Sequence, residues 1–157
     1  SKTTEFEVVR TSLIPGIMKT IEKNQMSPLP IRLFEISDVV LMSNSTETGA
    51  VNKRNLCFAY ANNQSGFEKV QGVVDHILGY KLGLKFNSPE GYSIKPTEDV
   101  RFFAGRQAEI IVKGKSCGIF GIVNPDVNKA FGKLPFPISL CEIEIEYIYN
   151  LIINKEI

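Results

Sequence analysis

The chain has 157 residues, of which 43% are hydrophobic and 22% are charged, with 12 glycines, 8 prolines and no tryptophan. This is the composition of an ordinary globular domain, and it excludes a disordered, a collagen-like or a disulfide-scaffold protein. The 18 lysines and arginines nearly balance the 17 aspartates and glutamates, so the net charge of +1 gives no long-range attraction for nucleic acid or acidic partners.

The sequence has no signal for membrane insertion or secretion. No stretch approaches the roughly 18 consecutive apolar residues that a membrane-spanning helix needs, and the first five residues do not resemble a secretory signal. The cysteines, Cys57, Cys117 and Cys141, are odd in number and widely spaced, so we expect buried, reduced thiols in a cytoplasmic protein. Because the chain starts with serine and ends in an apolar run, we expect a fragment of a longer protein.

A short strand over 6–9 and an amphipathic helix over 13–24 are the first predicted elements. Thr11 or Ser12 offers a hydroxyl N-cap for this helix. Apolar residues then recur at helical spacing: Leu13, Ile14, Ile17, Met18 and Ile21. The helix therefore needs a surface on which to bury this stripe.

Two strands and a second helix follow. A long strand is predicted over 31–42 and another over 54–61, with a polar loop over 43–49 between them. The second helix starts at Ser65-Gly66 and ends between Gly79 and Gly83. Its apolar stripe consists of Phe67, Val70, Val73, Val74, Ile77 and Leu78.

The remainder of the chain is predicted to be mostly strands. These are expected over 92–94, 108–112, 117–123 and 138–147. A hairpin turn with Gly114 at the position that tolerates positive φ joins the middle pair. Asn124 starts a short helix toward Phe131, and an apolar tail over 151–153 follows the final strand.

This order of elements indicates one α+β domain over 1–157, in which an antiparallel β-sheet is flanked by helices. We expect the helices to lie against one face of the sheet. No repeat and no internal linker divides the chain.

Few residues combine into a recognisable chemical site. His76 lies between the apolar positions of the second helix, without other residues at metal-ligand spacing, so we expect a surface histidine. Gly114-Lys115-Ser116 lacks the earlier glycine of a phosphate-binding loop, because Glu109 occupies that position. The sequence therefore predicts no catalytic, cofactor-binding or metal-binding residue.

Three carboxylates alternate with apolar residues in the final predicted strand. Glu142, Glu144 and Glu146 therefore share one face of that strand. We expect a solvated face rather than an acid pair or a cation site, because such alternation is typical of half-buried strands.

Arg106 follows an apolar stretch and a glycine at the approach to a strand. A guanidinium at such a place binds a carboxylate or a phosphate through two parallel hydrogen bonds. Both a structural ion pair and a ligand site that includes Glu109 stay open.

Five motifs occur in register along the chain. They are Val9-Arg10-Thr11-Ser12-Leu13-Ile14-Pro15-Gly16, Leu29-Pro30-Ile31-Arg32-Leu33-Phe34-Glu35-Ile36-Ser37-Asp38-Val39-Val40, Gly66-Phe67-Glu68, Phe103-Ala104-Gly105-Arg106-Gln107-Ala108-Glu109-Ile110, and Gly118-Ile119-Phe120-Gly121 with Asn124-Pro125-Asp126-Val127. Together they resemble the C-terminal, synthetase-like domain of phenylalanyl-tRNA synthetase beta subunits of the eukaryotic cytosolic and archaeal type, over about 5–148. Ala104 and Asn124 depart from the usual proline and the frequent histidine of the family, but neither change removes a charge.

The resemblance implies the core of a class II aminoacyl-tRNA synthetase that does not perform the reaction. In active relatives, the strand that matches 31–42 delivers an arginine to the ATP phosphates, whereas this chain offers Val40 and Leu41 there. Active relatives have a second ATP-binding arginine after a glycine-rich last strand. This chain has no arginine after Arg106 and no glycine after Gly132, so we expect no adenylation by the chain alone.

The resemblance further implies a structural domain that pairs with a catalytic alpha subunit in an α₂β₂ heterotetramer. The holoenzyme would join phenylalanine to tRNA(Phe) in the cytoplasm with the use of ATP and Mg²⁺. The resemblance implies that this domain itself binds no cofactor. We expect the subunit interface at Leu13, Ile14, Ile17, Met18 and Ile21, although packing in the core explains the same stripe.

Two other functions stay open. One is a synthetase-like module that binds an amino acid or a nucleotide through Arg106 and Glu109. The other is direct contact with tRNA through Lys113, Lys115, Lys129 and Lys133, against which the balanced charge argues.

Overall fold

The computed structural model describes residues 10–43, 47 and 49–154. The strand predicted over 6–9 and much of the loop predicted over 43–49 lie outside the described residues. Among the described helices, none has the length and apolar character required to cross a membrane.

Six strands form one antiparallel sheet in the order β1-β2-β6-β5-β4-β3. They are β1 (Ile31–Met42), β2 (Ala50–Ala61), β3 (Tyr92–Pro96), β4 (Phe102–Val112), β5 (Lys115–Val123) and β6 (Ile138–Glu144). The prediction for β1 is confirmed. β2 begins at Ala50 rather than Arg54, because its pairing with β1 continues until Met42 faces Ala50. β4 begins at Phe102 rather than Ala108, since Phe102 pairs with Val123 across an irregular stretch.

The helices are α2 (Ile14–Lys23), α3 (Phe67–Asp75), α4 (Pro125–Ala130) and α5 (Ile145–Ile153), and the π-helical segment η1 (His76–Lys81) continues α3. α2 and the combined length of α3 and η1 confirm the two predicted helices. Asn124 caps α4 as expected, since its side chain accepts a hydrogen bond from the Asp126 amide.

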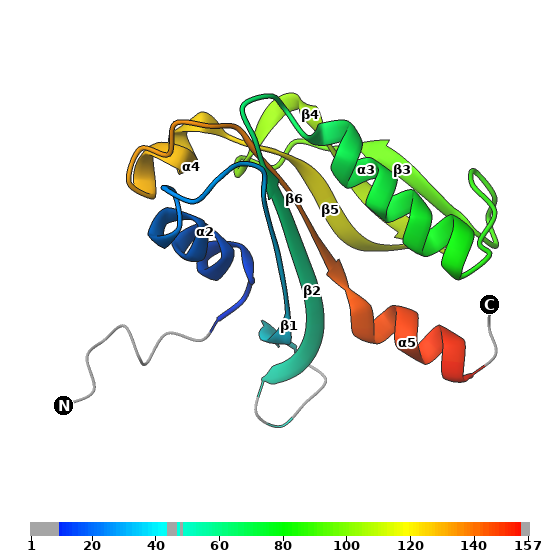
Figure 1. Cartoon of the computed structure of the whole chain (residues 1–157). Helices are drawn as coiled ribbons and strands as arrows, with labels where there is room; N and C mark the ends of the chain where they lie inside the picture. The colour runs from blue at the N-terminus through cyan, green and yellow to red at the C-terminus, as the bar shows by residue number, and fades with distance from the viewer. Residues whose placement is uncertain (1–9, 44–46, 48, 155–157) are drawn as a thin grey trace.

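The expectation that the helices lie against one face is wrong, because they cover both faces of the sheet. Figure 1 shows α2 and α4 on one side and α3 and α5 on the other. The physical reason is that the central strands are apolar on both faces. Ala59 and Leu140 pack with α2, whereas Phe58 and Cys141 pack with α3 and α5.

The predicted strand over 138–147 ends at Glu144, and the predicted apolar tail is the end of helix α5. Ile145, Ile148 and Leu151 recur at helical spacing, and all three pack into the core on the α3 side. Burial of this stripe favours the helix over a continued strand.

All three cysteines are buried and free, as expected. Cys57 lies in the core on the α2 side, and Cys117 and Cys141 lie in the core on the α3 side. Burial raises the pKa of all three thiols, that of Cys117 to about 12, so they stay protonated at neutral pH.

Candidate functional site

Arg106 and Glu109 both lie on β4, but the structure does not bring them together. Gly105, with φ of 79°, turns the chain before Arg106, whose side chain is exposed. Within the described residues the Arg106 side chain makes no hydrogen bond and no ion pair. Glu109 instead accepts a hydrogen bond from the Ser116 hydroxyl at 2.9 Å across the β4–β5 hairpin.

Gln107, between these two residues, is buried and fully hydrogen-bonded. Its Nε2 donates to the carbonyl oxygens of Asp99, Phe102 and Phe103 at 3.0, 3.3 and 3.3 Å. Its Oε1 accepts a hydrogen bond from the Asp99 amide at 2.6 Å. This side chain therefore fixes the connection between β3 and β4, although no pattern in the sequence marks Gln107 as buried.

Asp99 and Arg101 form a tight ion pair in the same connection. The Arg101 Nη2 lies 2.8 Å from the Asp99 Oδ2, and the Arg101 Nε lies 3.0 Å from its Oδ1. The hydrogen bond from Arg101 lowers the pKa of Asp99, against the opposing effect of burial. The pair holds the chain just before β4.

Glu142 is buried, so the expectation of a solvated face is wrong for this residue. The residue is 7% exposed and lies in the middle of the sheet, between Cys57 of β2 and Ile119 of β5. Its carboxylate accepts hydrogen bonds from the Ser12 hydroxyl at 2.6 Å, the Leu13 amide at 2.8 Å and the Asn55 amide group at 3.0 Å. The start of α2 covers this part of the sheet, and Glu142 anchors it.

A sequence signal for this burial exists. Residues 138–143 form an unbroken buried run, and the stretch Ile138-Ser139-Leu140-Cys141 before Glu142 contains no charge. Such a run is typical of a strand that is covered on both faces. The alternation of Glu142, Glu144 and Glu146 with apolar residues pointed instead to a solvated strand face.

Glu144 and Glu146 form ion pairs at the surface. Lys53 and Lys115 both lie 3.6 Å from the same oxygen of Glu144, and Lys53 also lies 3.7 Å from Glu146. Glu146 belongs to α5 and so does not share the strand with the other two. In the part of the chain that the structure describes, no group of three or more His, Cys, Asp or Glu could hold a metal ion.

The five apolar residues predicted at the subunit interface lie in the core of the chain itself. Leu13, Ile14, Ile17, Met18 and Ile21 are between 0 and 4% exposed and pack against the sheet. A contact between α2 and a partner would therefore have to use the other faces of this helix.

His76 is exposed, as expected, and stacks on Tyr80 with 5.1 Å between the ring centroids.

The four lysines that the tRNA-contact alternative invokes differ in their surroundings. Lys115 pairs with Glu144 and lies 4.4 Å above the Tyr147 ring, and Lys129 lies 3.8 Å from Asp126. Two of the four charges are thus offset by neighbouring carboxylates.

Taken together, Gln107, Asp99 and Glu142 hold separate segments of the fold in place. Their polar atoms are occupied by partners in the same chain. Arg106, next to Gln107 in the chain, is exposed, and its side chain has no described partner.

A family model for the phenylalanyl tRNA synthetase beta chain CLM domain matches residues 1–145. The chain is 46% identical over 144 residues to the phenylalanine–tRNA ligase beta subunit of Pongo abelii, covering 92% of this chain and 24% of that protein. It is 40% identical over 156 residues to the cytoplasmic phenylalanine–tRNA ligase beta subunit of Arabidopsis thaliana, covering 94% and 26%. The chain thus spans about a quarter of the length of these curated relatives.

The fold is similar to that of a class II enzyme of known structure. Desulfitobacterium hafniense PylSc, a pyrrolysyl tRNA synthetase, matches with a TM-score of 0.67 over 93% of this chain and 50% of that chain. The sequence identity is 10%, so this similarity concerns the fold alone.

Proposed function

The chain belongs to the phenylalanyl-tRNA synthetase beta chain CLM domain family, and we propose that it is a non-catalytic, architectural domain of a phenylalanine–tRNA ligase beta subunit. In this role it supports a catalytic alpha subunit during ATP-dependent attachment of phenylalanine to tRNA(Phe). The names of its relatives, all beta subunits of this ligase, support the proposal.

The carboxylates of β6 are the observation that most directly supports a non-catalytic role. The Glu142 carboxylate accepts hydrogen bonds from three donors of the chain itself, and the Glu144 carboxylate forms ion pairs with two lysines. Carboxylates repel the phosphates of ATP, and active class II relatives are expected to use arginines and glycines in this part of the fold. We therefore propose that ATP and Mg²⁺ are bound by the alpha subunit and not by this chain.

We also propose an α₂β₂ assembly in the cytoplasm, in which tRNA(Phe) is bound by the holoenzyme. The relative from Arabidopsis thaliana is named as cytoplasmic, which supports this location. Since the predicted interface side chains of α2 are buried in the core, the alpha subunit would contact residues that are exposed in this chain.

The test measures phenylalanine-dependent exchange between ATP and pyrophosphate. We expect none from the purified chain, and normal exchange from the holoenzyme made of the complete beta polypeptide and the alpha subunit. Size-exclusion chromatography with light scattering on that holoenzyme should give the mass of two copies of each subunit. Exchange by the purified chain alone would overturn the proposal.

The ligand-binding alternative is tested on Arg106. If the chain is an amino acid or nucleotide module, calorimetry with phenylalanine and with ATP should detect binding that Arg106→Ala abolishes. We expect no binding of either compound. We also expect Arg106→Ala to change the unfolding free energy by no more than about 0.5 kcal/mol, because the side chain is exposed and has no described partner.

A further inference from the structure

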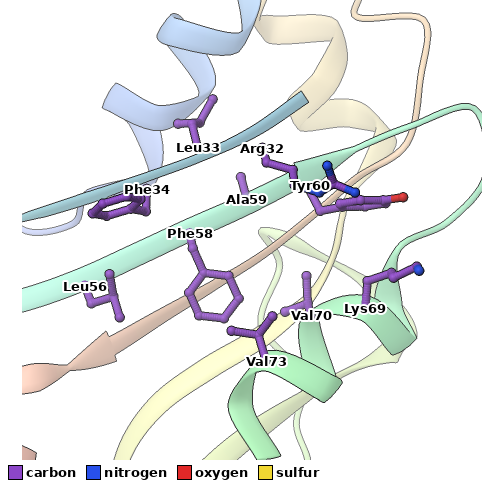
Figure 2. A pocket seen from close by; sticks show the side chains of 10 residues that line it. All are labelled: Arg32, Leu33, Phe34, Leu56, Phe58, Ala59, Tyr60, Lys69, Val70 and Val73. Atoms are coloured by element: carbon purple, nitrogen blue, oxygen red, sulfur yellow. The ribbon is translucent and has the colours of Figure 1, made fainter. Parts of the chain in front are cut away.

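The β1–β2 hairpin leaves an apolar groove on the side of the sheet that faces α3. We call this surface the hairpin groove and define it by Phe34 and Ile36 of β1, Leu56 and Phe58 of β2, and Val73 of α3. Figure 2 shows the Phe58 ring turned toward Val73, and Leu56 and Phe34 line the same hollow. Phe34 is 70% exposed, Ile36 is 51% exposed and Val73 is 42% exposed.

Two hollows follow one another along this groove. The first has a volume of about 430 Å³ and runs from Arg32 and Tyr60 to Leu56. The second has a volume of about 460 Å³ and lies between Ile36 and Tyr149 of α5. Because residues two apart on a strand share a face, the strip from Arg32 through Phe34 and Ile36 to Asp38 is continuous.

The two ends of the groove differ in charge. Arg32 and Lys69 lie at one end, where the Arg32 guanidinium is 5.6 Å from the centroid of the Tyr60 ring. Neither cation forms an ion pair with another described residue. At the other end Asp38 and Arg54 neutralise each other at 3.0 Å. The occupant is therefore expected to place negative charge beside Arg32 and Lys69.

We propose that the hairpin groove is the docking site of an amphipathic helix supplied by a part of the beta polypeptide outside these 157 residues. The distance along β1 from Arg32 to Asp38 is about 20 Å at ~3.3 Å per residue, which a helix of about 13 residues spans. The apolar stripe of that helix covers Phe34, Ile36 and Phe58. Its C-terminal end, with acidic side chains, lies beside the two cations.

A helix of the same polypeptide fits better than a separate subunit. A stable interface between separate proteins uses about 20–30 residues on each side, whereas ten residues line the first hollow and six line the second. A tethered segment needs far less contact, because its effective concentration is in the millimolar range. The inference rests on the proposed function, since the relatives are about four times as long as their match to this chain.

The test is site-specific photo-crosslinking in the holoenzyme. Phe34→p-benzoylphenylalanine is introduced into the complete beta polypeptide, which is produced with the alpha subunit and irradiated, and the crosslinked peptides are identified by mass spectrometry. We expect a crosslink to a helical segment of the same polypeptide outside this chain. Met26, which is 94% exposed and outside the groove, carries the same photo-crosslinker as the matched control and should give no such product.

Arg32→Glu in the crosslinkable protein should strongly reduce the yield, whereas Lys19→Glu, on the exposed side of α2, should leave it unchanged. A crosslink to the alpha subunit, a crosslink to a second beta chain, or no crosslink would each overturn the proposed occupant. Copurification of alpha and the exchange activity are measured on the same samples. These two measurements test the proposed function independently of the crosslink. If the complex forms and is active but the crosslink is missing, only the proposal about the hairpin groove is contradicted.

Discussion

The buried carboxylate of Glu142 connects strand β6 to the start of α2. Its position in an alternating run indicates a solvated strand face, but the Ser12 hydroxyl and the Leu13 amide reach its carboxylate from a segment about 130 positions away. The carboxylate thereby accepts a hydrogen bond from the backbone amide of Leu13, just before α2. A buried carboxylate is tolerated here because three donors satisfy it.

Glu142→Ala should destabilise the fold by about 1–3 kcal/mol, because it leaves the Leu13 amide and the Asn55 side chain without their acceptor. Urea unfolding followed by circular dichroism measures the change. Glu146→Ala is the matched control, since it removes only a surface ion pair with Lys53 and should cost less than about 1 kcal/mol. Equal effects of the two substitutions would contradict the buried role of Glu142.

The Asp99–Arg101 pair predicts an acid-dependent part of the stability. Arg101 lowers the pKa of Asp99 in the folded state below its ordinary value of 3.8. The stabilisation is therefore fully present above pH 3.8 and is lost as the pH falls through the lower, folded-state pKa. In Asp99→Asn, the fall in melting temperature below pH 3.8 should be shallower than in the unsubstituted chain. A parallel fall in both proteins would show that this pair does not contribute.

At the scale of elements, the close approach of β4 and β5 depends on a glycine. Gly121 faces Gln107 across the strand pair. A Cβ at this position would lie 2.5 Å from the Arg106 carbonyl oxygen and 2.9 Å from the Gln107 Cα. Both are backbone atoms, so the neighbouring strand would have to shift.

Gly121→Ala should therefore destabilise the chain by about 1–3 kcal/mol. Gly72→Ala is the control, because a Cβ there meets nothing within 4 Å and alanine favours the α3 helix by up to about 1 kcal/mol. Chemical unfolding should move the two midpoints in opposite directions. A shift of the Gly121→Ala midpoint to higher denaturant would contradict the tight strand contact.

The end of β6 shows how two element types compete for one segment. The residues around 142–147 alternate between charged and apolar, which predicts a strand, but Ile145, Ile148 and Leu151 also form a helical stripe. β2 pairs with β6 only as far as Glu144. Beyond that residue the helix buries more apolar surface against the core on the α3 side, so the helix forms.

For the whole molecule, the uncovered hairpin groove predicts self-association when the chain is separated from its partners. Phe34 and Ile36 are 70% and 51% exposed, and adjoining apolar side chains of this kind favour contact between copies of the chain. We expect the mass from light scattering to rise with concentration, and Phe34→Glu to return it toward the monomer. Phe103→Glu, at an exposed phenylalanine outside the groove, should not do so. A constant monomer mass at high concentration would contradict this expectation.

Local sequence patterns were sufficient to predict most helices and strands of this chain and to identify its family. The helical spacing from Leu13 to Ile21, the long strand over 31–42 and the glycine turn at 114 are local patterns, and the structure confirms all three. Five motifs in register were enough to identify the family, because each reflects a local structural requirement of the fold. Of the candidate site, the sequence predicted Arg106 as a cation of interest but could not show whether Glu109 lies beside it.

Which faces of the sheet are covered depends on contacts between distant segments and could not be predicted from local patterns. Periodicity specifies that Glu142 and Glu144 share a strand face, but not that the start of α2 lies over one of them and that lysines surround the other. It also could not place helices on both sides of the sheet or leave Phe34 open to solvent. These outcomes depend on strand order and on segments that are far apart along the chain, because burial is a property of what packs above a residue and not of its own neighbours in sequence.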